Sequence, residues 1–213
     1  MEDVLPHLTS LRSLDLGQDT GKGLANPEIT MIHSRLNYLR VSLQDVAHLY
    51  YLMSSKTLSA ILGQFHVTLR SKFPECERFL PEDLELSPMM NLHTFTLVQT
   101  ILSDNRIEWS TIELLTAPNY MPILRRVNLA IFITLDELHG MKRSLLFTDD
   151  RRIDVQFAFI VDDVSSGVQL SDQVPHGSRF HPRQVVGATC VRSGLSPEYR
   201  HLPNINCHVS TSV

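Results

Sequence analysis

A short pattern of apolar residues, Leu-x-x-Leu-x-Leu or a close variant, recurs five times along the chain. The copies begin at Leu11, Leu36, Leu62, Leu92 and Leu124. Phe or Val replaces some of the leucines, and residues 153–159 form a weaker, sixth copy in which apolar and polar residues alternate. Such self-similarity restricts the fold more than any other feature, because each copy must become the same structural unit.

The last three positions of each copy alternate with a period of two, which predicts a short strand with its leucines on one face. The segments between copies are long enough for a helix. A strand and a helix repeated at this interval predict an α/β fold, specifically a leucine-rich-repeat solenoid with a parallel sheet on its concave face and helices on its convex face. A doubly wound sheet, which also alternates strands with helices, is the competing architecture.

Helices are expected over the amphipathic segments 45–53, 107–115 and 135–146. Asp45 can cap the first of them, and Asp104 or Asn105 can cap the second. Thr134 and Glu137 have the spacing of a capping box at the start of the third. Three of the five intervals between the predicted strands are therefore expected to hold a helix with its own start signal.

Three regions are expected from the composition. Residues 1–160 hold the solenoid of five to six repeats, and residues 161–192 form a cap or clasp that includes one short strand within 184–191. Residues 193–213 are rich in Gly, Pro, Ser and His and are expected to form a disordered tail.

The charge argues against nucleic acid or an anionic membrane as the main partner, because the 213 residues carry a net charge of −4. The three cysteines are an odd number and include no C-x-x-C pair, which fits a reducing compartment. The sequence has no secretory signal pattern and no long apolar run. These observations predict a cytoplasmic or nuclear protein.

No motif of a known catalytic, metal or cofactor site is found. Residues 17–23 resemble a phosphate-binding loop but lack its spacing and its final Ser or Thr, so we interpret them as a turn. The histidines and cysteines after residue 175 are spaced too irregularly for a structural zinc site. We therefore expect no catalysis, metal or cofactor, although a small α/β enzyme with scattered site residues is the alternative.

If the repeats stack in register, the polar positions between the leucines form two columns on the concave surface. The Asp15 column contains Asp15, Arg40, His66, Thr96, Asn128 and Gln156, and the Ser13 column contains Ser13, Tyr38, Gln64, Thr94, Arg126 and Asp154. Tyr and Arg are frequent in the energetic centres of interfaces. We predict that these columns bind a protein partner.

The repeats and the segment 121–129 (MPILRRVNL) carry a resemblance to a known family. Over roughly residues 5–159, the chain resembles the leucine-rich-repeat-like C-terminal half of an F-box protein. The resemblance implies capture of a substrate protein for a ubiquitin ligase, whose adaptor binds a separate F-box helix bundle. No F-box is seen in this sequence. An incomplete repeat array without independent activity is a further alternative.

Overall fold

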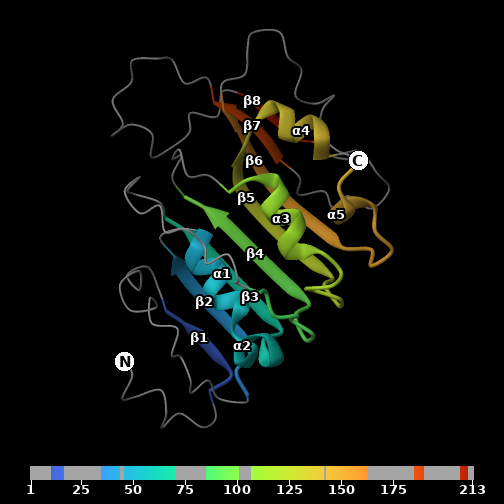
Figure 1. Cartoon of the computed structure of the whole chain (residues 1–213). Coiled ribbons are helices and arrows are strands. Elements are labelled where there is room, and N and C mark those ends of the chain that lie inside the picture. The colour runs from blue at the N-terminus through green and yellow to red at the C-terminus, as the bar shows by residue number, and fades with distance from the viewer. Residues whose placement is uncertain are drawn as a thin grey trace.

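A computed structural model of the chain describes a single mixed sheet with helices packed against it (Figure 1). Its architecture is α/β, as the sequence predicts. The described residues are 11–16, 35–43, 46–70, 85–100, 107–141, 143–162, 185–189 and 207–210.

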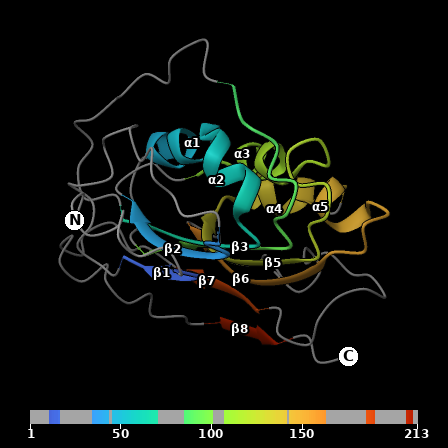
Figure 2. The ribbon, with the colours of Figure 1, turned by 90° about the horizontal axis from the view of Figure 1, so that it is seen from below.

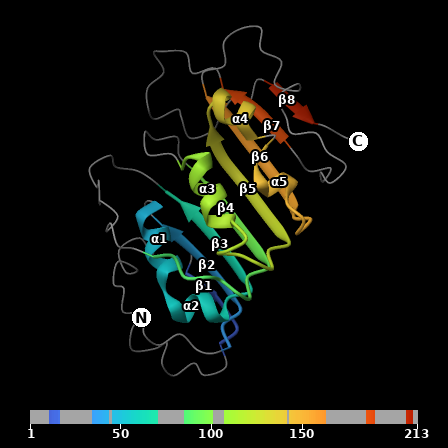
Figure 3. The same ribbon diagram turned by 45° about the vertical axis from the view of Figure 1, so that its right-hand side comes forward.

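The strands follow one another across the sheet in chain order, as Figure 3 shows. Neighbours from β1 to β7 are parallel, and β8 alone pairs antiparallel, with β7. The strands are β1 (Ser13–Asp15), β2 (Tyr38–Leu43), β3 (Gln64–Leu69), β4 (Thr94–Gln99), β5 (Arg126–Ile133), β6 (Asp154–Asp162), β7 (Val185–Thr189) and β8 (Cys207–Ser210). Each copy of the sequence pattern thus leads into one strand, including the weaker copy in β6.

The helices lie on one face of the sheet, which Figure 2 shows edge-on. They are α1 (Val46–Ser54), α2 (Lys56–Ile61), α3 (Trp109–Thr116), α4 (Leu135–Met141) and α5 (Leu145–Thr148). A doubly wound sheet has helices on both faces and reverses its strand order at a switch point. Within the described residues, the strand order does not reverse and the second face carries no helix.

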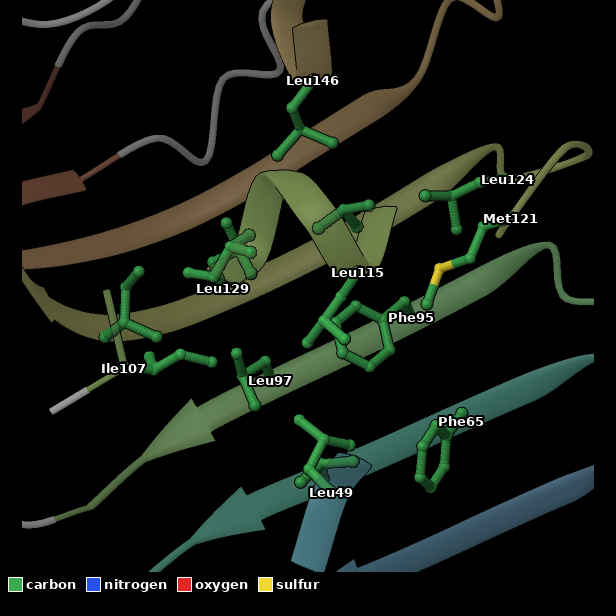
Figure 4. Close-up of a cluster of buried hydrophobic side chains, with 14 of the residues drawn as sticks. Leu49, Phe65, Phe95, Leu97, Ile107, Leu115, Met121, Leu124, Leu129 and Leu146 are labelled. Atoms are coloured by element: carbon green, nitrogen blue, oxygen red, sulfur yellow. The ribbon is translucent and has the colours of Figure 1, made fainter. Parts of the chain in front are cut away.

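The core lies between the helices and the sheet. The leucine positions of successive repeats are paired across neighbouring strands and form continuous buried columns, one of which is Leu39, Phe65, Phe95, Val127 and Val155. Side chains of α1, α3 and α5, among them Leu49, Leu115 and Leu146, pack onto these columns (Figure 4). Stacking the repeats therefore buries apolar surface that no single repeat could cover alone.

Trp109, the first residue of α3, packs against the last repeats. The indole is 5% exposed, stacks on Phe147 of α5 at 6.0 Å and meets the Phe159 ring edge-on at 5.9 Å. Phe157 and Phe159 of β6 stack at 4.2 Å. This aromatic cluster joins two helices to β6.

The helices differ in detail from the sequence prediction. The segment 135–146 is two helices, because α4 ends at Met141 and the Ser144 hydroxyl accepts a hydrogen bond from Leu146 N to start α5. Helix α3 begins at Trp109, so neither Asp104 nor Asn105 is its cap, and both lie outside the described residues, as does Asp45. Helix α2, capped by Ser55, was not predicted.

The C-terminal region also departs in part from the prediction. Strand β7 lies within the segment where one short strand was expected, and it pairs with β6. Strand β8 lies inside residues 193–213, for which no regular structure was predicted. Four residues therefore extend the sheet beyond the expected clasp.

Candidate functional site

The candidate site is the face of the sheet opposite the helices, which we call the open face. The Asp15 column and the Ser13 column lie on it, because their residues alternate with the buried leucine positions. Strand pairing aligns Ser13, Tyr38, Gln64, Thr94, Arg126 and Asp154, and likewise Asp15, Arg40, His66, Thr96, Asn128 and Gln156. The structure thus brings every predicted site residue into two neighbouring columns that span β1 to β6.

Two ion pairs lie at opposite ends of these columns. Arg40 Nη1 is 3.4 Å from Asp15 Oδ2, and the two side chains are 46% and 49% exposed. Arg126 Nε is 3.3 Å from Asp154 Oδ2, with the side chains 57% and 30% exposed. Exposed pairs of this kind contribute only about 0–1 kcal/mol to stability. Their charges are therefore placed on the open face without being needed to hold the fold.

Neutral polar side chains form further hydrogen bonds on the open face. Asn128 Nδ2 donates a hydrogen bond of 2.9 Å to Thr96 Oγ1, which links β5 to β4. Gln156 Nε2 donates to Asp154 Oδ2 at 3.4 Å within β6. These contacts order the short side chains of the open face, so a partner would meet a preorganised polar surface.

His66 occupies the centre of the Asp15 column and is half-buried. Burial lowers the pKa of His66 below its ordinary value of 6.5, the positive charge of Arg40 lowers it further, and the negative charge of Asp15 opposes both. The neutral imidazole is consequently favoured in the folded protein.

A third column on the open face consists of small residues, changes from polar to apolar along the sheet, and was not predicted. It continues each strand past the Asp15 column and aligns Ser42, Thr68, Val98, Ala130 and Ala158. Ser42 and Thr68 are buried, whereas Ala158 is exposed. The change to small residues could have been found by extending the alignment of the repeats by two positions.

The helical side carries a shallow hollow of about 500 Å³ between α3 and the α4–α5 turn. Glu108, Glu113, Glu137 and Arg143 contribute its charged groups. Glu137 is already engaged there, since Oε1 accepts from Trp109 N at 3.0 Å and Oε2 accepts from Thr134 N at 2.8 Å. Glu137 N in turn donates to Thr134 Oγ1 at 3.2 Å, which confirms the predicted capping box.

Metal-ligating residues are not gathered within the described part of the chain, where no group of three or more His, Cys, Asp or Glu side chains is placed to hold an ion. Residues 17–23 and most of the tail histidines and cysteines lie outside it. None of the described helices has the length and apolar character to cross a membrane. No protein-family model, curated protein or solved structure matches the chain significantly.

Proposed function

We propose that this protein is a non-catalytic binding module, a leucine-rich-repeat-like solenoid that holds a protein partner against its open face. One observation carries the proposal, namely that both polar columns run in register across six parallel strands. Strand order and the location of all described helices on the other face also support it.

The composition of the columns suits protein recognition. Tyr38, Arg40 and Arg126 are of the residue types that supply most of the energy in interfaces, and they stand on backbone that is fixed by sheet hydrogen bonds. A rigid scaffold loses little conformational entropy when it binds. The open face can thus contribute affinity without first having to fold around its partner.

We further propose, from the resemblance to F-box proteins, that the partner is a substrate of a ubiquitin ligase in the cytoplasm or nucleus. In that arrangement the repeats select the substrate. Contact with the ligase adaptor would require an F-box helix bundle, which the repeats do not supply.

A quantitative pull-down tests binding through the open face. We expect the double variant Arg40→Ala/Arg126→Ala to lose most of the proteins captured by the parent, because both exposed guanidinium groups are removed. The matched control is Arg143→Ala, which removes an exposed arginine on the helical side. Circular dichroism would check that all three proteins are folded. Capture of every partner by the double variant would refute recognition by the open face.

A further inference from the structure

We propose that the open face takes an extended acidic peptide segment, with two Asp or Glu side chains about four residues apart that bind Arg40 and Arg126. The inference deepens the proposed function and rests on it. It names the chemistry of the segment that the two columns recognise.

The order of charges across the sheet supports an acidic ligand. From β1 to β6 the columns present an acid and a base at one end, Asp15 then Arg40, and a base and an acid at the other, Arg126 then Asp154. Both arginines are on the inner side of their pairs. Between these arginines, β3 and β4 contribute the neutral polar residues Gln64, His66, Thr94 and Thr96. The middle of the face is therefore bordered by two positive charges.

Each arginine retains donors for a ligand. Arg40 contacts Asp15 through Nη1, and Arg126 contacts Asp154 through Nε. Within the described residues, the remaining guanidinium nitrogens of both arginines have no acceptor. A guanidinium group binds a carboxylate through two parallel hydrogen bonds, so each arginine can hold a second carboxylate beside its present one.

The spacing sets the shape of the ligand. Arg40 on β2 and Arg126 on β5 are three strands apart, which is about 14 Å at the usual strand separation. In an extended peptide, side chains four residues apart lie on the same side and about 13 Å apart. Flexible arginine side chains can accommodate the remaining offset of about 7 Å along the strands.

The narrowness of the polar surface favours an extended segment over a helix. The two columns lie two residues apart along the strands, so their backbone positions are only about 7 Å apart. A helix is about 10–12 Å wide with its side chains and would extend over the third column. An extended segment that runs across the strands can stay within the two columns.

Synthetic peptides test the inference. The probe is a fluorescently labelled nine-residue peptide of Thr and Ser with Glu at its third and seventh positions, and matched peptides carry Gln or Lys there. By fluorescence polarisation at low salt, we expect the Glu peptide to bind at least tenfold more tightly than either of the others. We also expect its affinity to fall as salt is added, because the contacts are ionic.

A charge-swapped protein provides the sharper test. The variant Asp15→Arg/Arg40→Asp/Arg126→Asp/Asp154→Arg retains both possible ion pairs and reverses their order. We expect it to prefer the Lys peptide by a similar factor. If it fails to fold, the variant Arg40→Gln/Arg126→Gln replaces it, and we expect this protein to bind the Glu and Gln peptides equally.

Two outcomes would overturn the inference. Equal binding of the Glu, Gln and Lys peptides to the parent would exclude recognition of paired carboxylates. A peptide that binds only when phosphoserine replaces Glu would show that the ligand is a phosphate group. In either case, loss of captured proteins in the pull-down with Arg40→Ala/Arg126→Ala would leave the proposed function standing, so the two failures can be told apart.

Discussion

At the scale of single residues, His66 makes the stability of the folded protein depend on pH. Its lowered pKa means that the unfolded chain takes up a proton first as the pH falls below about 6.5. The stabilisation from the neutral imidazole is complete above that pH and is lost as the pH falls toward the lower pKa of the folded state. We expect His66→Gln to flatten the dependence of stability on pH between about pH 7 and pH 5. Urea unfolding at several pH values measures this, and parallel curves for parent and variant would contradict it.

The alignment of the candidate residues on one face could be predicted from the sequence, because a fixed repeat determines which side chains share a face. Arg40 and Arg126 were placed in neighbouring columns on that basis alone. Their ion pairs with Asp15 and Asp154 were not predicted, since they depend on rotamers that alternation does not determine. The lowered pKa of His66 likewise depends on burial, which sequence spacing does not give.

At the scale of elements, Glu137 joins two helices. Its carboxylate closes the capping box of α4 and also accepts a hydrogen bond from the first residue of α3. We expect Glu137→Ala to reduce the free energy of unfolding by about 1–2 kcal/mol, because two helix starts lose an acceptor. Asp136→Ala, next to it and exposed, should change stability by less than about 0.5 kcal/mol. Equal urea midpoints for the two variants would show that the shared cap adds nothing.

Helix starts were predicted less well than strands for a physical reason. A capping pattern read from sequence assumes that the cap is a near neighbour, as Thr134 is for α4. At the start of α3, the backbone N–H of Trp109 instead donates a hydrogen bond to Glu137, 28 residues away. Such long-range caps become visible only when the repeats are stacked. The break between α4 and α5 was missed for a different reason. Ser144 is a local cap, but the apolar periodicity continues through it and predicts one helix.

At the scale of the whole molecule, stability comes from contacts between neighbouring repeats. Phe95 lies fully buried in the middle of the array, 6.1 Å from Phe65 by ring centroids. We expect Phe95→Ala to cost about 3–5 kcal/mol. Hydrogen exchange should then show weakened protection from β2 to β6 together, because the central repeat couples both halves. Met90→Ala, an exposed control, should leave protection unchanged. Loosening confined to β4 would contradict coupling across the array.

The position of Trp109 has a practical consequence for studying this chain. It is the only tryptophan in the sequence, and its indole touches aromatic rings of α5 and β6. Its emission therefore serves as a built-in optical reporter for the later repeats, while circular dichroism averages over the entire array. A chain whose first strands had separated would lose ellipticity and still emit at short wavelength.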